Sequence, residues 1–483
     1  MAKKSYKRNI LYNSIYRCVV IITPLITSPY LTRVLGAEKL GIYSASNAFA
    51  TYFVIFSLLG VNDYGNRSIA QVRGNREKLS DTFWQIYYVQ FFLTIVLLAV
   101  YLISIATTGK YFQIQLVLAI YVLSSLFEIS WFAVGMEKFK LTSICNTITH
   151  LGIVSGIFLF VKQPSDLWKY TLVVTTGNLV SLLVLLPLVF RYTDFRKPDL
   201  QKMLQHLKPN LVLFLPIIAT SVYQYLSKIM LNAWSTEAEG GFYQNAENIV
   251  NLPTFITTAI VTVMLPYASN LVANGASDEN RQLLGSTLKY TSILNVAMAF
   301  GIFSIAGDFI PWYLGAEFQR SAVLVRMMAP LIFINGFSNV LRYQCIIPNE
   351  MDKANLVSMF TGAAVNVVLN LFLIPVYGAG GAAVSVCLAT FVTLVIQMLY
   401  VREKIDLKSV FRSFAPSILF GLLMAVCVMA VSKLPINTLL LILIELVTGV
   451  AVYLTCTALW LEKTGDNVIS SMFKGMLAKL KRE

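Results

Sequence analysis

Charged residues are scarce in this chain of 483 residues: they make up 13% of the sequence, where soluble globular domains have roughly 25%. The hydrophobic share is 57% and the mean hydropathy is +0.68. Apolar runs of about twenty residues recur along nearly the whole chain, and twenty helical residues span a bilayer. The composition therefore excludes a soluble enzyme and predicts an all-α polytopic membrane protein.

The residues that usually carry chemistry are also few. The six cysteines stand singly in apolar runs, and no two of them have the spacing of a metal or redox site. We interpret them as small buried apolar residues and expect no resident cofactor. The sequence has no Gly-rich phosphate loop followed by Lys-Ser or Lys-Thr, so ATP hydrolysis is not expected. Energy for any transport would then come from a H⁺ or Na⁺ gradient, the membrane potential or consumption of the substrate.

The apolar runs predict fourteen membrane-spanning helices. Alternating segments of about ten residues, which would indicate a transmembrane barrel, are absent. The predicted spans are 9–33, 39–61, 82–105, 112–134, 139–161, 168–190, 209–231, 242–271, 287–311, 321–345, 355–376, 380–401, 411–432 and 437–460.

The basic residues predict the orientation. With both termini in the cytoplasm, the segments outside the predicted spans hold 24 of the 38 Lys and Arg residues on the cytoplasmic side and 4 on the opposite side. The net charge of +14 is thus explained by topology and contact with membrane lipids, and needs no nucleic acid. Arg17 interrupts the first apolar run, which favours a retained helix over a signal peptide. Residues 463–483 predict a basic amphipathic tail on the inner leaflet, or alternatively a docked partner helix.

Two internal matches indicate a repeat of six helices. Gly41-Ile42-Tyr43 opens the second span and Gly241-Phe242-Tyr243 opens the eighth, while Met136-Glu137-Lys138 matches Met351-Asp352-Lys353. We therefore expect an N-terminal lobe of helices 1–6 (residues 1–200), a C-terminal lobe of helices 7–12 (201–408) and two further helices (409–462). Parallel repeats of this kind are typical of transporters, with the substrate site between the halves near the midplane.

Polar residues within the spans are candidates for that site, because polar and ionisable groups in hydrocarbon usually face a bundle interior or a cavity. In the functional interpretation these residues line a positively charged cavity that binds an anionic group. The guanidinium of Arg17 would bind phosphate in bidentate fashion, Lys228 would add a point charge, and Glu247 would neutralise Arg17 or Lys228 when the cavity is empty. The alternative is that these groups form inter-helix hydrogen bonds or reach toward the interface. The candidates are Asn13, Arg17, Tyr43, Asn47, Gln224, Lys228, Glu247, Asn251 and Arg326.

Other buried polar residues are weaker candidates. Glu128 on the fourth span is compatible with either function or structure, and we interpret His150 as a histidine of the bundle interior. Asn366 and Asn370 predict hydrogen bonds between helices. Glu445 on the last span lies outside the repeat, where it would contact a docked helix or lipid.

Two sequence segments resemble polysaccharide and O-antigen flippases of the multidrug/oligosaccharidyl-lipid/polysaccharide exporter superfamily. One is Leu35-Gly36-Ala37-Glu38-Lys39-Leu40-Gly41-Ile42-Tyr43-Ser44, followed by Leu59-Gly60 and Arg67-Ser68-Ile69-Ala70. The other is Ile374-Pro375-Val376-Tyr377-Gly378-Ala379-Gly380-Gly381-Ala382-Ala383. The resemblance covers the whole chain and implies two six-helix lobes plus a final pair.

The resemblance implies a flippase that moves undecaprenyl-pyrophosphate-linked oligosaccharide units across the bacterial cytoplasmic membrane by alternating access. It places Arg17 where lipid-linked-precursor flippases carry an arginine on the first span, and it implies a polysaccharide polymerase and a chain-length regulator as partners. A drug or cation antiporter of the same superfamily is the first alternative, disfavoured because Arg17 stands on span 1 in place of an acid. A membrane glycosyltransferase or polymerase is the second, disfavoured by short outer loops.

Overall fold

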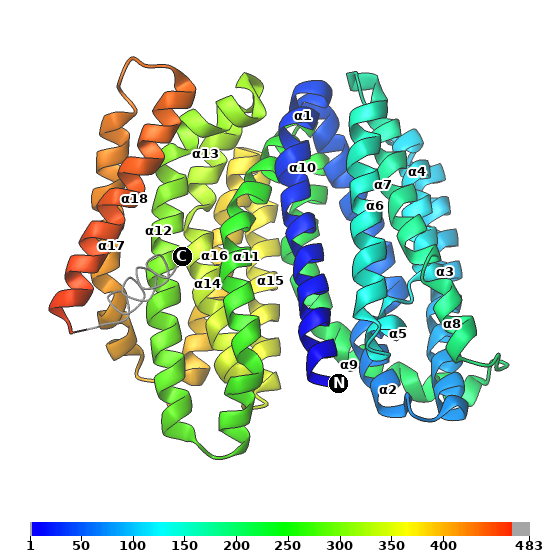
Figure 1. Ribbon diagram of the computed structural model, residues 1–483. Coiled ribbons are helices and arrows are strands. Elements are labelled where there is room, and N and C mark those ends of the chain that lie inside the picture. The colour runs from blue at the N-terminus through cyan, green and yellow to red at the C-terminus, as the bar shows by residue number, and fades with distance from the viewer. Residues whose placement is uncertain (1, 466–483) are drawn as a thin grey trace. The chain divides into compact units, whose positions relative to one another are not determined.

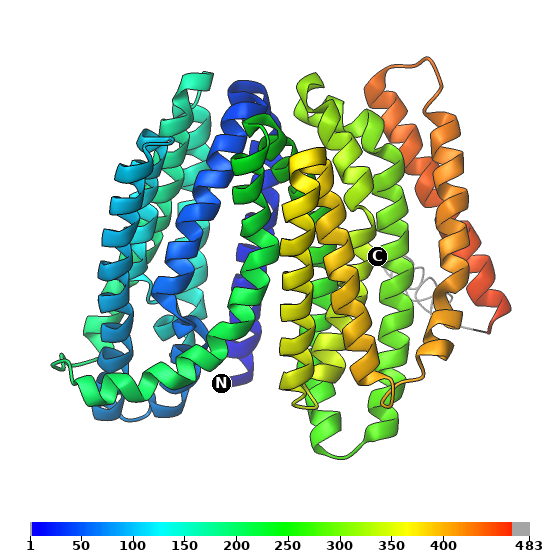
Figure 2. The same cartoon turned by 180° about the vertical axis from the view of Figure 1, so that it is seen from behind.

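The computed structural model describes residues 2–465 and, among them, the side chains of all but residues 2–18, 21, 139, 277 and 407. Every regular element in this range is a helix (Figures 1 and 2). The first half of the chain forms α1 (Ala2–Leu58), α2 (Val61–Val72), α3 (Arg76–Thr108), α4 (Phe112–Ser124), η1 (Ser125–Phe127), α5 (Ser130–Gly135), α6 (Phe139–Phe160), η2 (Pro164–Asp166), α7 (Leu167–Leu183), α8 (Leu186–Tyr192), α9 (Leu200–Ser221), η3 (Val222–Leu226) and α10 (Ser227–Trp234).

The second half is built in the same way from long helices with short breaks. It forms α11 (Glu237–Ala273), α12 (Ser277–Leu314), η4 (Ala316–Phe318), α13 (Gln319–Met328), α14 (Pro330–Leu341), η5 (Arg342–Ile346), α15 (Asp352–Tyr377), α16 (Ala379–Val401), α17 (Leu407–Val431) and α18 (Thr438–Lys463). The predicted amphipathic tail, residues 463–483, lies outside the described residues from position 466 onward.

The described helices confirm a multi-pass membrane protein. Twelve stretches are long and apolar enough to cross a bilayer, and the pair Ala316–Met328 and Pro330–Ile346, bent by 43°, makes a thirteenth. Spans 1 and 2 of the prediction both fall in α1, whose backbone leaves the helical conformation at Gly36 (φ 75°, ψ 173°). Each predicted span thus corresponds to a helix, to part of α1 or to a broken helix.

The described chain divides into two compact units, which do not coincide with consecutive stretches of sequence. The first contains residues 1–245 and 363–386, and the second contains 246–362 and 387–483. The boundaries of the two predicted lobes stay a prediction.

The first unit accommodates a break in a membrane-spanning helix. Between α4 and α5 the backbone leaves the helix at Glu128, which would expose polar groups that lipid cannot satisfy. Gln90 on α3 answers this need, because its Nε2 donates to the carbonyls of Ser125 (2.6 Å) and Glu128 (2.9 Å) and its Oε1 accepts from Trp131 Nε1 (3.2 Å). The Glu128 carboxylate accepts from the backbone N–H of Ser130 at 3.0 Å. Glu128 therefore has a structural role at the start of α5.

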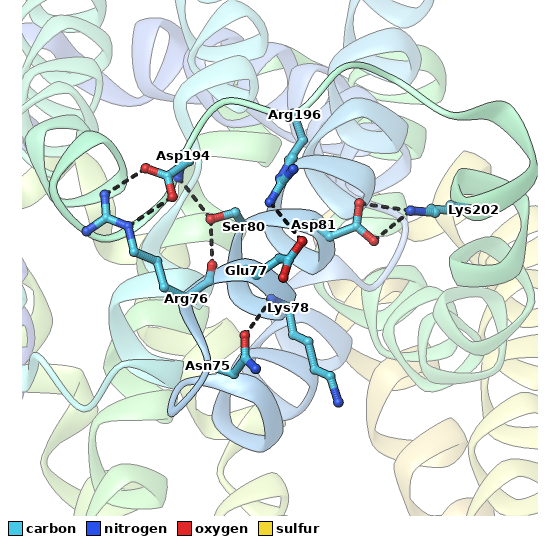
Figure 3. Close-up of polar contacts among 9 residues, drawn as sticks. All are labelled: Asn75, Arg76, Glu77, Lys78, Ser80, Asp81, Asp194, Arg196 and Lys202. Atoms are coloured by element: carbon cyan, nitrogen blue, oxygen red, sulfur yellow. Dashed lines mark hydrogen bonds and ion pairs between the residues drawn. The ribbon is translucent and has the colours of Figure 1, made fainter.

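The segment that leads into α9 is fastened to the beginning of α3 by ion pairs (Figure 3). Arg76 binds Asp194 through two hydrogen bonds of 2.8 and 3.0 Å, and Lys202 binds Asp81 at 3.0 Å. After these ion pairs, α9 contains Pro209 and Pro216. Figure 2 shows that the first part of α9 runs at a steep angle to its second part. Leu200 and Leu204 on the first part are exposed, as expected for a helix at a lipid interface.

The second unit packs α17 and α18 beside α12 (Figure 1). Its core contains Phe337, Phe414 and Val428 at 1% exposure or less. Large apolar side chains on the outside of its helices, such as Val263 and Leu446, are at least half exposed. Such surfaces would aggregate in water and match the hydrocarbon of a bilayer.

Candidate substrate site

The two glycines that mark the predicted repeat lie against each other. A β-carbon added to Gly41 on α1 would lie 1.7 Å from the carbonyl oxygen of Glu237, and one added to Gly241 on α11 would lie 2.0 Å from the carbonyl oxygen of Ala37. Only a residue without a side chain allows two helix backbones this close. The sequence match thus marks a direct contact between α1 and the start of α11.

Beyond this contact, α1 presents polar and aromatic side chains to the helices of the first unit. The ring of Tyr43 packs edge-on against Tyr170 of α7, with 4.7 Å between centroids. Asn47 lies one turn further along and is half-buried, and its carbonyl accepts from the hydroxyl of Thr51. Tyr43 and Asn47 are therefore on the face of α1 that looks into this unit.

The spanning helix that carries Gln224 and Lys228 is interrupted by an irregular turn between α9 and α10. Residues Val222–Leu226 form a single π-helical turn, an arrangement found often at functional sites. Tyr52 of α1 donates to the Ser221 carbonyl at 3.2 Å and packs edge-on against Tyr225 with 6.3 Å between centroids. The last residue of α9 thus supplies the carbonyl, and the π-turn supplies the ring, to which α1 binds. Gln224 lies on this turn and is exposed.

Lys228 follows the π-turn and is buried, with 9% of its surface exposed. Its ammonium lies 5.6 Å from the centroid of the Tyr225 ring, within the range of a cation–π interaction. A lysine buried in a spanning helix is costly to keep charged, so such residues usually mark an ion or substrate pathway. The structure therefore places Lys228 beside Tyr225, which in turn contacts Tyr52.

Behind Lys228, a hydrogen-bonded cluster joins α10 to α15. Asn370 Nδ2 donates to Ser227 Oγ at 2.9 Å and to Asn366 Oδ1 at 3.1 Å, and all three residues are fully buried. The predicted role of Asn366 and Asn370 in helix–helix hydrogen bonding is confirmed. This cluster fixes the rotation of α10, and hence the direction in which Lys228 points.

A second polar cluster joins the start of α4 to the junction of α10 and α11. Tyr111 donates a short hydrogen bond to Glu237, and Lys110 Nζ donates to Asn232 Oδ1 at 3.0 Å. Burial, followed by the bond to Glu237, raises the pKa of Tyr111 to about 12. The hydroxyl thus keeps its proton at physiological pH, and the hydrogen bond persists there.

Three predicted residues belong to the second unit. Glu247 is half-buried and Asn251 is exposed, both on α11. Arg326 on α13 is half-buried, donates from Nε to the Phe303 carbonyl of α12 at 3.1 Å, and lies over the Phe303 ring. Arg326 is thus placed by its contacts with α12.

The side chains of Asn13 and Arg17 lie outside the described residues, and their assignment stays a prediction. Sequence reasoning missed Tyr225, which lies beside Lys228, and Tyr52, which packs against Tyr225. The available signal was spacing: Tyr225 stands three residues before Lys228, on the same helical face.

Comparison with known proteins places this arrangement in context. The family model described as "Polysaccharide biosynthesis protein" matches residues 6–272. A putative O-antigen transporter of Escherichia coli (strain K12) is 22% identical over 407 residues, covering 83% of this chain and 98% of the relative. A probable low-salt glycan biosynthesis flippase, Agl15, of Haloferax volcanii is 22% identical and covers 89% of this chain and 91% of its own length.

Among solved structures, the fold is similar to that of the lipid II flippase MurJ in an inward closed conformation. The TM-score is 0.77, the identity is 15%, and the match covers 94% of this chain and 99% of the other. At this identity the likeness concerns the fold, and the predicted fold class is confirmed by it.

Proposed function

Because the chain belongs to the polysaccharide biosynthesis protein family, we propose that it is a flippase for undecaprenyl-pyrophosphate-linked oligosaccharide repeat units. Relatives named as O-antigen transporter and glycan biosynthesis flippase support a transporter, and they support no enzymatic activity. In this proposal the units cross the bacterial cytoplasmic membrane by alternating access and are then assembled into capsule, O-antigen or another surface polysaccharide.

The observation that carries the proposal is the burial of Lys228 beside Tyr225 in a spanning helix that contains a π-turn. A pyrophosphate crossing a membrane must exchange water for protein cations and hydrogen-bond donors. Lys228 supplies a cation, Tyr52 and Gln224 supply polar groups, and the predicted role of Arg17 adds a guanidinium. Aromatic rings at this level would pack against the sugar faces, as amphipathic rings do in polar pockets.

The energy source is part of the same proposal. We infer coupling to a H⁺ or Na⁺ gradient or to the membrane potential, since the sequence lacks a nucleotide-binding loop. Both termini are proposed to face the cytoplasm, in line with the distribution of basic residues. A polysaccharide polymerase and a chain-length regulator are the proposed protein partners.

The two alternatives differ in testable ways. A cation antiporter would need an acid where the first span carries Arg17. A glycosyltransferase or polymerase would need a catalytic loop, yet the connections that bear on this are short: residues 109–111 between α3 and α4, and 432–437 between α17 and α18. The proposed flippase needs neither feature.

The test is the fate of the lipid-linked units in cells that lack the chain. Export of the polysaccharide should stop, and lipid-linked units should accumulate in the inner leaflet, protected from a membrane-impermeant oxidant that cleaves exposed sugars. Re-expression of the chain should restore both export and accessibility. Normal export with no accumulation would refute the flippase, while accumulation of unextended sugars would indicate a glycosyltransferase.

A further inference from the structure

Glu445, in the second unit, is a fully buried acidic residue on a spanning helix. The residue on α18 is 0% exposed, and neither side-chain oxygen accepts a hydrogen bond from a donor among the described residues. It also lines a cavity of about 310 Å³ between α11, α12, α17 and α18. The remaining lining is uncharged and largely apolar, and includes Gly301, Ile302, Met424 and Gly449. A buried carboxylate in such surroundings needs a compensating partner.

The charged groups that act on Glu445 come from two neighbouring helices. The Asp308 carboxyl on α12 acts on it most strongly, through its charge and through a hydrogen bond that requires a proton on one of the two groups, and the Arg326 guanidinium from α13 acts on it through its charge alone. Arg326 is held against α12 by its bond to the Phe303 carbonyl and by its close approach to Gly307, one residue before Asp308. The three side chains therefore form one cluster.

Other titratable groups near the cluster are accounted for. Tyr453, which also lines the cavity, donates its hydroxyl to the Ile293 carbonyl at 2.7 Å and is thereby directed onto α12. The residues of α17 that line the cavity are Met424 and Val428, which do not ionise. Asp308 and Arg326 thus set the charge balance of Glu445.

The chemistry of this cluster requires a proton. A carboxylate only accepts hydrogen bonds, so two carboxyl groups bind each other only when one of them is protonated. With both ionised, two negative charges would face one arginine in a medium that penalises net charge. With one proton shared, the cluster is neutral.

We propose that Glu445 and Asp308 form a proton-binding site in which the two carboxyl groups share one proton beside Arg326. Asp308 is half-buried and lies six residues before the end of α12, roughly 9 Å along the helix, so it is the member that exchanges protons with water. Glu445, fully enclosed, retains the shared proton. Use of this site to couple proton movement to transport rests on the proposed function, whereas proton binding itself does not.

The experiment measures the proton directly, on the purified full chain in lipid nanodiscs and without substrate. Infrared absorption of protonated carboxyl groups is recorded across a pH series. The site predicts a protonated carboxyl that remains at neutral pH, in an amount of one per protein. Glu445→Gln should remove it, since Asp308 is then left to pair with Arg326. Glu462→Gln, an exposed acid on the same helix, is the matched control and should leave the band unchanged.

Two further variants separate a proton site from a packing defect. Asp308→Asn should also remove the band, because the new amide can donate to an ionised Glu445, and it serves in place of Glu445→Gln if that variant does not fold. Arg326→Gln should increase the band, because a second proton is then needed for neutrality. Absence of the band in the unmodified chain, or its survival in both Glu445→Gln and Asp308→Asn, would overturn the proposal. Failure of the export test with the band present would refute the flippase alone.

Discussion

Gly41 and Gly241 occupy equivalent places in the two halves of the predicted repeat, and each faces the backbone of the helix that carries the other. An added β-carbon would meet a carbonyl oxygen at 1.7 Å in one case and 2.0 Å in the other. Such reciprocity is expected of the predicted repeat, because equivalent residues would meet where two related helices cross. This contact connects the position of α1 to that of α11.

The first prediction concerns this contact. Gly41→Ala should destabilise the protein by about 1–3 kcal/mol, the usual cost of overpacking, because backbone atoms must move apart. The higher helix propensity of alanine offsets only ~1 kcal/mol of that loss. Thermal unfolding of the purified protein measures the change. Gly152→Ala on α6 is the control, since a β-carbon there meets nothing within 4 Å, and its melting temperature should stay the same or rise.

The same contact predicts that the stability losses of the two single variants are not additive. Gly41→Ala and Gly241→Ala each push α1 away from the start of α11. Once one substitution has separated the helices, the second costs less, so the double variant should lose less stability than the two single variants together. Full additivity would show that the two glycines act on separate contacts.

The second prediction concerns Lys228. Lys228→Met keeps an unbranched side chain of similar length and removes its charge, and it should lower export by roughly 10- to 100-fold, the worth of one hydrogen bond to a charged group. Lys228→Arg should keep most of the activity. Export in cells lacking the native chain is the measurement, with protein levels checked in the membrane fraction.

A matched control for Lys228 exists in the second unit. Lys289 also lies over an aromatic ring, 5.5 Å from the centroid of Trp460, but on a different helix. If Lys228 mattered only through cation–π packing, Lys289→Met would reduce export to the same extent. The proposed pyrophosphate role expects Lys289→Met to export normally.

The third prediction concerns Arg17, whose role was inferred from the sequence. Arg17→Ala should abolish complementation of polysaccharide export while leaving protein levels intact. Arg17→Lys should restore export only in part, because an ammonium cannot form the paired hydrogen bonds of a guanidinium with phosphate. Normal export by Arg17→Ala would remove the pyrophosphate role from this residue.

Much of the fold could be predicted because lipid restricts what the backbone can do. Every polar backbone group in the bilayer core must be satisfied internally, so a long apolar run predicts a helix directly. The break after Gly36 and the contact marked by the Gly41 and Gly241 motifs also follow from short sequence signals.

The breaks inside spans could not be predicted in this way, because they depend on partners distant in sequence. The irregular backbone at Glu128 is satisfied by Gln90 of α3, and the π-turn before Lys228 packs through Tyr225 against Tyr52 of α1. For the same reason the sequence did not indicate that Arg326 and Glu445 act on each other. Hydropathy locates a charge within a span, but only packing shows which charges meet.

The last prediction concerns the clip between Asp194 and Arg76 (Figure 3). The hydrogen bonds from Arg76, which outweigh the other influences, lower the pKa of Asp194 below its ordinary value. A carboxyl whose pKa is lowered by folding stabilises the fold at pH values above its unfolded pKa, ~3.9 for aspartate, and loses that effect as the pH falls through the lower folded value. At pH 7, Asp194→Asn should therefore increase the rate at which a protease cleaves residues 193–199. In strong acid the variant and the parent should be cleaved alike by an acid protease.

Asp63→Asn, an exposed acid on α2, serves as the control and should change neither rate. The exchanged pair Arg76→Asp with Asp194→Arg should recover protection at pH 7, and failure of both the single and the paired variants to alter cleavage would show that the ion pair does not hold this segment.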